Sequence, residues 1–327
     1  MNRTRHCVRT LLVCMALALP VIHAYAAEPR YPVRPIRLIV PFVAGGGTDL
    51  LARILTPRLS ELLGQQIVVD NRGGAGSILG TQLLAKSPAD GYTIGVFDTA
   101  FAINPGFAEK LPYDAERDFA FVAIIATSPT VLVTHPGLKV RTLQELVGAA
   151  RANPNKIRAA SAGIGSSSHL TIEMFNAAAK IRLLHVPYKG AGAAIQDILG
   201  GHTDLTFAVA GSVVAQIQAG TMLALGVTGK KPSAILPNVP TFAAAGFPQV
   251  DPEAFRFVVA PAGIPSGVSQ KLTAALTTIM ASPEIKTRLV DNGFEPEFQT
   301  GKDAREFVVR EIRKWRQAVK EAGVKPN

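Results

Sequence analysis

Short apolar strand segments alternate with segments of helical periodicity along most of this chain, and this alternation constrains the fold more than any other feature. The first strand is expected at Ile36–Val40, and the first helix covers Leu50–Leu63, where Gly64 ends it. Similar strand and helix signals follow in turn over residues 67–97 and 142–228. Strands that alternate with helices over short connections predict an α/β fold with parallel-rich sheets and helices on both faces.

Length and composition set the scale of this fold. The 327 residues are enough for two domains, each with its own core. A content of 48% hydrophobic and 18% charged residues is typical of a globular chain. Thr142 and Glu145 have the spacing of a capping box at one helix start, and the stretch Ser269–Lys320 is predicted to be mostly helical.

The first 26 residues have the pattern of a signal peptide. Three arginines within the first nine residues precede an apolar stretch at Leu11–Leu19, and Ala24–Ala26 fits the small-residue cleavage rule. Cleavage is therefore predicted before Ala27, with export of the remaining chain. A membrane anchor is the alternative, but this apolar run is shorter than the roughly 20 residues that span a bilayer.

Both cysteines, Cys7 and Cys14, lie inside this leader. The exported chain would contain no cysteine, which excludes disulfides, thiolate metal sites and cysteine nucleophiles from it. A lipid anchor at Cys14 would require small residues before it, and the chain has Leu11–Val13 there.

The net charge of the chain is positive. Loss of the three arginines of the leader lowers the formal charge from +10 to +7. This charge suits an anionic ligand or surface, although a merely basic soluble protein fits equally well. Aromatic residues make up only 6%, and the basic residues of Arg305–Lys320 alternate with glutamates, so nucleic acid is not an expected partner.

Two glycine-rich loops that lead into helices are the candidate ligand sites. Gly46–Thr48 and Gly165–Ser167 each follow a strand, and a helix start offers unpaired N–H groups and the positive end of the helix dipole. If the loops belong to different domains, they would hold the two ends of one small diacid. Both loops are equally consistent with simple helix capping. Asp49 either caps its helix or repels an anion, and Phe42 lines either a pocket or the core.

Enzymatic alternatives find little support in the motifs. Gly74-x-Gly76-x-x-x-Gly80 only approaches a dinucleotide fingerprint, and export disfavours a soluble nicotinamide cofactor. The segment Gly165–His169 places serine beside histidine but is not a G-x-S-x-G elbow. The remaining histidines lack metal-binding spacings. No catalytic residue, cofactor or metal ligand is therefore predicted.

Eight short segments, in order, resemble one known family. They cover essentially all of the chain after the leader, and their combination is far more specific than any one of them. They resemble the motifs of the tripartite tricarboxylate transporter substrate-binding receptors, the Bug or TctC-like family. The segments are Val40–Asp49, Val69–Gly76, Pro88–Thr93, Ala102–Pro105, Leu111–Asp114, His185–Gly190, Leu236–Thr241 and Ala260–Gly263.

This resemblance implies a two-lobed periplasmic binding protein of type II-like architecture, with a ligand cleft between the lobes. Two crossover segments are then expected near Ala123–Pro129 and near Ala254–Val259. The implied lobe 1 is discontinuous, with residues 27–126 and 255–327, and lobe 2 has residues 127–254. A protein of this kind is a receptor and not an enzyme.

The resemblance also implies a set of ligand-binding residues. One end of a small carboxylate would be bound by the first glycine-rich loop, the other end by the second loop, and the far wall would lie near Tyr188. The implied residues are Phe42, Val43, Ala44, Gly47, Thr48, Asp49, Gly165, Ser166, Ser167, Tyr188, Lys189 and Ala208.

The chain departs from the usual family pattern at three places. Val43–Ala44 stand where Pro-Pro is common, Ala208–Ala210 stand where a polar pair is common, and Ala100–Phe101 replace a Thr-His-like pair. The pocket is therefore expected to be more apolar than usual. We hypothesise a ligand with one carboxylate and an apolar or aromatic body, in preference to citrate.

The implied partners are a small carboxylate and the membrane subunits of a tripartite transporter, with the receptor itself a monomer in the periplasm. Two other functions compete with this one. The same fold could deliver its ligand-loaded surface to a signalling receptor, or the chain could be a secreted α/β hydrolase. Neighbouring genes for two membrane subunits would favour transport.

Overall fold

The structure is a computed structural model that describes residues 31–188, 190–229, 232–252 and 254–323. The predicted leader, its cleavage point and Lys189 lie outside these ranges. Contacts group Arg34–Asn327 into one compact unit, separate from Met1–Val33. None of the helices within the described ranges is both long and apolar enough to cross a bilayer.

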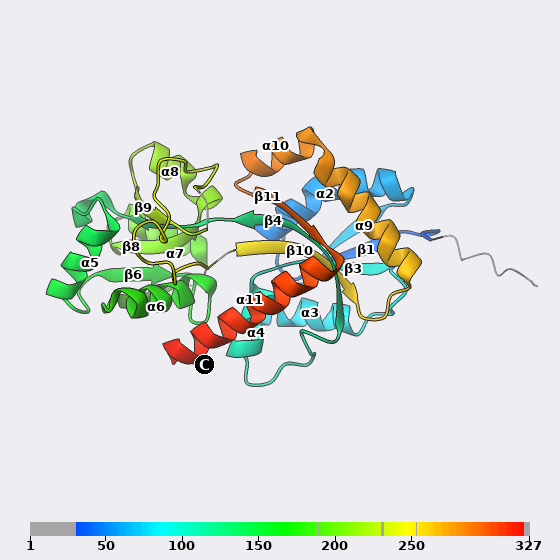
Figure 1. The fold of residues 1–327 in the computed structure, drawn as a ribbon, viewed down its shortest axis with the longest axis horizontal. Coiled ribbons are helices and arrows are strands. Elements are labelled where there is room, and N and C mark those ends of the chain that lie inside the picture. Colours follow the sequence, from blue (N-terminus) through cyan, green and yellow to red (C-terminus); the bar gives the residue numbers. More distant parts are fainter. Residues whose placement is uncertain (1–30, 189, 230–231, 253, 324–327) are drawn as a thin grey trace, which may run out of the picture. The chain divides into compact units, whose positions relative to one another are not determined.

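The first of two sheets has six strands in the order β11-β4-β10-β3-β1-β2 (Figure 1). Its first three strands are parallel to one another: β1 (Ile36–Val40), β2 (Ile67–Asn71) and β3 (Thr93–Asp98). The other three pair antiparallel: β4 (Phe119–Ser128), β10 (Ala254–Pro261) and β11 (Glu295–Thr300).

The second sheet has five strands in the order β7-β6-β8-β5-β9. Here β6 is parallel to β7 and β8, whereas β5 is antiparallel to β8 and β9. The strands are β5 (Thr130–Thr134), β6 (Arg158–Ser161), β7 (Leu184–Pro187), β8 (Leu205–Val209) and β9 (Leu223–Val227).

Helices cover both faces of each sheet (Figure 1). On the first sheet, α2 (Gly47–Leu63), α9 (Ser266–Ala281) and α10 (Pro283–Asp291) lie on one face. Its other face carries α3 (Ile78–Ala85), α4 (Ala100–Phe107) and α11 (Gly301–Ala322). The second sheet packs against α5 (Leu143–Ala152) and α6 (Ser167–Ala179) on one face, and against α7 (Ala191–Leu199) and α8 (Val214–Gln218) on the other. The described residues also form the short 3₁₀ turns η1 (Ala75–Ser77), η2 (Pro136–Leu138) and η3 (Ala210–Ser212).

Several local expectations are confirmed. The strand at Ile36–Val40 is present, and Gly64 ends α2 in the left-handed conformation with φ of 68°. Thr142 caps α5, because its hydroxyl accepts a hydrogen bond from Glu145 N at 3.1 Å. The Glu145 carboxylate in turn accepts a hydrogen bond from Arg141 N at 2.7 Å. In a capping box this second bond comes from the N-cap residue, and here it comes from the residue before it.

Two features add detail to the expected fold. Each sheet has a parallel set, β1 to β3 and β6 to β8, but β10 runs antiparallel between β3 and β4, and β5 runs antiparallel between β8 and β9. The stretch Ser269–Lys320 is interrupted by the strand β11, which follows α10 at the edge of the sheet. Its six residues are all half-buried and mostly polar, so they lack the apolar alternation that marks a strand in sequence.

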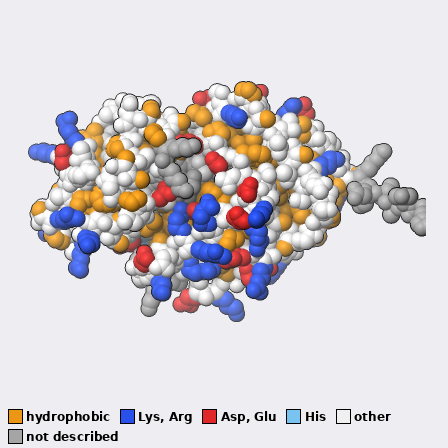
Figure 2. Space-filling view, viewed as in Figure 1, with side chains coloured by type: hydrophobic (Ala, Val, Ile, Leu, Met, Phe, Trp, Pro, Cys, Tyr) orange, Lys and Arg blue, Asp and Glu red, His pale blue; other side chains and the backbone are white. Residues whose placement is uncertain are grey.

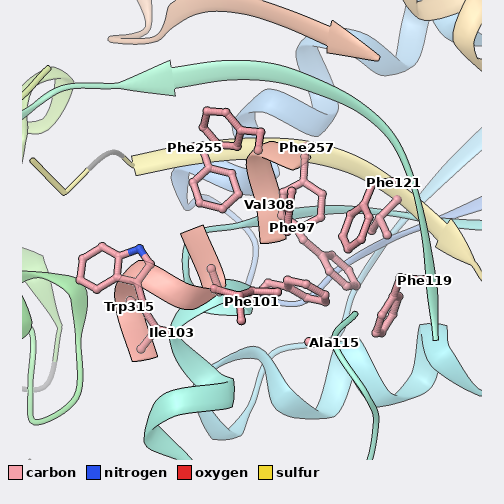
Figure 3. Close-up of a cluster of buried hydrophobic side chains, with 14 of the residues drawn as sticks. Phe97, Phe101, Ile103, Ala115, Phe119, Phe121, Phe255, Phe257, Val308 and Trp315 are labelled. Carbon is pink, nitrogen blue, oxygen red and sulfur yellow. The ribbon is translucent and has the colours of Figure 1, made fainter. Parts of the chain in front are cut away.

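An aromatic cluster fills the core between the first sheet and α4 and α11 (Figure 3). Phe101 of α4 packs edge-to-face on Phe119 and Phe257, with ring centroids 5.1 and 5.4 Å apart. Phe255 packs in the same way on Phe307 of α11 at 5.1 Å. Aromatic pairs of this kind stabilise a core beyond their buried area. The cluster therefore fixes α4 against β3 and β10, beside the edge where the candidate site lies.

The candidate ligand site

The parallel strands of the first sheet end together at one edge. Val40, the last residue of β1, is in register with Asn71, the last residue of β2, and β3 ends nearby at Asp98. Ligands of open α/β sheets bind outside the carboxyl ends of such strands. The loop from Pro41 to Gly46 leaves this edge and leads into α2.

Asp49 stabilises this first loop from within. Its side chain is only 2% exposed, and it accepts hydrogen bonds from Gly45 N at 2.9 Å, from Asn71 Nδ2 at 3.0 Å and from Arg53 Nε at 2.9 Å. Burial alone would raise the pKa of Asp49, but hydrogen bonds from Arg53, Gly45 and Asn71 outweigh it and lower the pKa. The carboxylate thus points into the loop and keeps it in shape.

Thr48 ties the start of α2 to the end of β3. Its hydroxyl donates to Asp98 Oδ2 at 2.9 Å, and Asp98 Oδ1 accepts a hydrogen bond from Ala100 N at 2.9 Å. Desolvation by burial raises the pKa of Asp98. Three elements, α2, β3 and α4, therefore meet at one carboxyl group.

The start of α2 is open. Gly46 occupies the N-cap position and has no side chain with which to cap the helix. Gly47 is exposed, and so are residues 43–46 of the preceding loop, with Val43 76% exposed. The first N–H groups of a helix have no partner within the helix, so an uncapped start is able to donate to an anion.

The start of α6 is different because the second loop satisfies itself. The Ser166 hydroxyl donates to Gly163 O at 2.6 Å and accepts from His169 N at 3.3 Å, and so caps the helix. Ser168 accepts a hydrogen bond from Ala162 N at 2.9 Å. Ser167 is exposed, and no hydrogen bond to its hydroxyl occurs among the described residues.

Two stacked histidines lie beneath the second loop. The ring centroids of His169 and His185 are 3.8 Å apart, and the rings are nearly parallel, with an interplanar angle of 5°. His169 Nδ1 accepts a hydrogen bond from Gly165 N at 3.1 Å, and His185 Nε2 lies 2.6 Å from Ser161 Oγ. Burial, together with the neighbouring His185, lowers the pKa of His169 to about 4, and burial also lowers the pKa of His185. Both rings are therefore neutral near pH 7.

Helix α4 links the two loops. It begins beside Asp98, which Thr48 contacts, and it ends at Phe107. The Phe107 ring packs directly on Gly165, so that a Cβ added there would lie only 2.3 Å from Phe107 Cζ. Eight helical residues span about 12 Å. The two helix starts, each from a different sheet, are thus placed at opposite ends of one short helix.

Other residues implied by the resemblance lie in different surroundings. Phe42 is half-buried, and its carbonyl accepts a hydrogen bond from Asn71 Nδ2 at 3.2 Å. The Tyr188 hydroxyl donates to Asp197 of α7, and Ala208 is buried in the core beside α7.

Sequence reasoning did not single out Arg256, Phe107 or the Thr48 contact with Asp98. Arg256 did carry a signal, because it is the one charge within the otherwise apolar strand Ala254–Pro261 and a buried arginine is rare. Asp98 also carried a signal, because it directly follows an apolar strand segment in the sequence. No local sequence pattern indicated that Phe107 packs against Gly165.

Comparisons with known proteins give a consistent result. The family described as the tripartite tricarboxylate transporter family receptor (TctC) matches residues 51–324. The UPF0065 protein in the tcbD-tcbE intergenic region of Pseudomonas sp. strain P51 is 37% identical, over 98% of this chain and 96% of that one. Protein BugT of Bordetella pertussis is 33% identical over 99% of both chains.

Solved structures agree with these sequence matches. An R. palustris protein with adipate has a TM-score of 0.81 and 32% identity, over 91% of this chain and 100% of its own. MatC from Rhodopseudomonas palustris with bound malate has a TM-score of 0.76 and 29% identity, over 88% and 100%. The periplasmic binding protein BugD has a TM-score of 0.78 and 32% identity, over 91% and 100%. The chain therefore belongs to the tripartite tricarboxylate transporter receptors, the TctC or Bug family of periplasmic binding proteins.

Proposed function

We propose that this protein captures a small carboxylate between the starts of α2 and α6 and delivers it to a membrane transporter. The observation that carries this proposal is the open start of α2, with its uncapped N–H groups at the edge of the first sheet. Adipate and malate, the ligands of two related structures, are both small carboxylates.

The lobes that close on the ligand would be residues 27–126 with 255–327, and residues 127–254. Strands β4 and β10 pair with each other along this proposed boundary, from Ala254 with Ser128 to Pro261 with Phe119. A pair of strands that connects two sheets is a suitable hinge, because small changes in a few backbone angles reorient whole lobes. Closure would sequester the ligand and change the surface that a partner contacts.

Within the proposed site, the residues divide by role. Gly47 and Thr48 would present N–H groups to the ligand, and Phe42, Val43 and Ala44 would contact its apolar part. Gly165 and Ser167 would approach from the second loop. Asp49 and Ser166 would shape the two loops, because their polar atoms are already hydrogen-bonded within them. Tyr188 and Ala208 would support the second lobe from its core.

The ligand would carry an apolar or aromatic body in preference to the three carboxylates of citrate. Val43 and Ala44 are exposed apolar side chains beside the open helix start. Apolar groups next to a charge-binding end favour a ligand with a hydrophobic part, since burial of each CH₂ contributes about 0.8 kcal/mol.

The site would bind without catalysis. A hydrolase would use an accessible serine activated by histidine. Here the Ser166 hydroxyl donates to Gly163 O and His169 accepts from Gly165 N. Ser161 does lie 2.6 Å from His185 Nε2, but it is fully buried. The chain would act in the periplasm as a monomer after cleavage before Ala27. The second candidate function is that of a sensor, which would bind a signalling receptor once the ligand is bound. The surface of the ligand-bound protein would suit either a transporter or such a receptor.

Thermal unfolding of the chain from Ala27 to Asn327 tests this proposal. The panel includes adipate, malate, citrate, benzoate and hexanoate, with neutral amino acids as controls. A ligand that binds only the folded state at 100 times its Kd adds about 2.7 kcal/mol of stability, so a dose-dependent rise is expected for at least one carboxylate. No shift with any acid, from protein that mass spectrometry shows to be free of co-purified ligand, would contradict the proposal.

A further inference from the structure

Arg256 is a buried cation at the edge of the sheet where the open helix starts. It lies on β10 between Phe255 and Phe257, which both belong to the aromatic cluster (Figure 3). Neighbouring residues of a strand point to opposite faces, so Arg256 points away from this cluster and toward the α2 face. Arg256 is only 7% exposed.

The guanidinium group has few partners for a buried charge. Nη1 donates to Ser128 Oγ at 2.9 Å, and the group lies over the ring of Phe294, 5.0 Å from its centroid. Nε is buried without a hydrogen-bond partner. Among the residues that the structure describes, no carboxylate forms an ion pair with Arg256. A guanidinium has five N–H donors, and the described residues offer a hydrogen-bond acceptor to Nη1 alone.

The unused donors face the start of α2. A Cβ added to Gly47, the first residue of this helix, would lie 3.3 Å from Arg256 Nη2. The guanidinium therefore lies beside Gly47, at the uncapped start of α2. A helix start and a guanidinium are both positive, and their proximity raises the positive potential at one point.

Asp98 is the nearest counter-charge but its oxygens are committed elsewhere. It pairs with Arg256 across the β3–β10 ladder, while its two oxygens accept hydrogen bonds from Thr48 and Ala100. Desolvation lowers the pKa of Arg256, and the attraction of Asp98 opposes this only in part. A buried charge with few hydrogen-bonding partners is costly, and among the described residues no carboxylate pairs directly with this guanidinium.

We propose that Arg256 binds a carboxylate of the ligand directly, together with the first N–H groups of α2, and that this subsite selects anionic ligands. The inference rests on the function proposed above and adds its charge-recognising residue. A guanidinium matches a carboxylate with two parallel N–H···O bonds, which a lysine does not reproduce. The bound carboxylate would supply the partner that Nε and Nη2 lack.

Isothermal titration calorimetry with adipate and malate, and with the neutral analogue adipamide, tests this subsite. Hydrogen bonds to charged groups contribute about 1.5 to 3 kcal/mol, so R256Q is expected to weaken binding of the acids by about 10- to 150-fold. R256K should fall between R256Q and the wild type. Adipamide should bind weakly and equally to the wild type and to R256Q.

Two matched variants separate ligand binding from structural damage. S128A removes the hydrogen-bond partner of Arg256 but leaves the cation, so it should weaken acid binding by less than about fivefold. R158Q removes an arginine that pairs with Asp204 in the second sheet, and it should leave acid binding unchanged. The guanidinium Nε–H resonance of Arg256, assigned by its absence in R256K, should shift when adipate is added to the wild-type protein.

The possible outcomes are distinct. If the wild type binds adipate or malate but R256Q binds it within threefold, or the Nε–H resonance does not move, the inference is wrong while the proposed receptor function stands. If R256Q does not fold, the resonance of the wild-type protein alone decides. If the wild type binds no carboxylate, both proposals are wrong.

Discussion

The two helix starts of the candidate site look alike in sequence but differ in structure. Both follow a strand and a glycine-rich loop, yet α2 has the bare Gly46 at its cap, whereas Ser166 caps α6 with its own hydroxyl. The start of α2 also has Arg256 beneath it. A helix start that is already satisfied has little capacity to bind an anion. We therefore expect the start of α2 to bind the charged end of the ligand and the start of α6 to shape the pocket.

The two loops are also stabilised by different chemistry. An ionised carboxylate, Asp49, accepts the loop N–H group of Gly45, whereas a neutral imidazole, His169, accepts that of Gly165. The first acceptor is strengthened by Arg53, and the second lies stacked on His185. The loops should therefore respond differently to substitution and to acid.

The largest loss of stability is expected from a substitution at the contact between α4 and the second loop. Gly165 has φ of +76°, and Phe107 occupies the space of its missing Cβ. In G165A, the alanine has to adopt the left-handed conformation, which costs about 1 to 2 kcal/mol. Its methyl group also clashes with the Phe107 ring, and overpacking of this kind costs about 1 to 3 kcal/mol more. We expect a loss of about 3 kcal/mol in the free energy of unfolding, measured by urea titration.

If the double variant F107A/G165A recovers part of the lost stability, the clash lies between residue 165 and the Phe107 ring. The control G148A changes a glycine of α5 that has open space, and it should be neutral or slightly stabilising. A loss below about 1 kcal/mol in G165A would show that the loop moves freely away from α4.

Acid should weaken the second loop before the first. The pKa of His169 is about 4 in the folded protein, below its usual 6.5, so the unfolded chain binds the proton more readily. The stabilisation is complete above about pH 6.5 and is lost as the pH falls toward 4. A shift of this size corresponds to roughly 3 kcal/mol.

The free energy of unfolding of the wild type and of H169N, followed from pH 7.5 to 4, measures this effect. The difference between the two proteins should shrink as the pH falls. If the free energies of unfolding of the wild type and H169N differ by the same amount at every pH, the stabilising role assigned to neutral His169 is wrong.

Substitution of Asp49 should cost about 2 kcal/mol. D49A leaves the Gly45 N–H group without its acceptor and removes one of the two acceptors of the Asn71 amide. Donors that lose their partner on burial are unfavourable by about 1 to 3 kcal/mol, and these two are partly buried. Carboxylate affinity should also fall, because the loop that leads to Gly47 loses its shape. Calorimetry and urea unfolding of D49A and D49N measure both effects. Unchanged affinity in a destabilised D49A would separate this loop from the binding site.

The smallest effect is expected at the cap of α6. S166A removes a helix cap, which costs about 1 kcal/mol. Because Ser166 is hydrogen-bonded within its loop, carboxylate affinity should change less than threefold. A tenfold loss of affinity with unchanged stability would show instead that the Ser166 hydroxyl contacts the ligand directly.

Much of the fold was predictable from local signals, because these depend on neighbouring residues. The strand Ile36–Val40, the helix end at Gly64 and the cap at Thr142 all follow from local pattern and capping chemistry. The strand β11 was missed because its polar residues are only half-buried at a sheet edge. Local signals also located both glycine-rich loops.

The difference between the two loops was not predictable in the same way. Whether a helix start is open depends on side chains brought from distant positions, such as Arg256 beside Gly47 and Phe107 against Gly165. The Tyr188 hydroxyl likewise finds Asp197 only after β7 and α7 pack together. Such contacts are set by tertiary packing, which no short motif encodes.

A crystal structure of the protein with the carboxylate that gives the largest thermal shift would test the unequal roles of the two helix starts most directly. We predict a ligand carboxylate within hydrogen-bond distance of Arg256 and of the first N–H groups of α2, with the body of the ligand directed toward α6. A structure in which the only carboxylate contacts come from the start of α6, and Arg256 remains unpaired, would contradict this assignment.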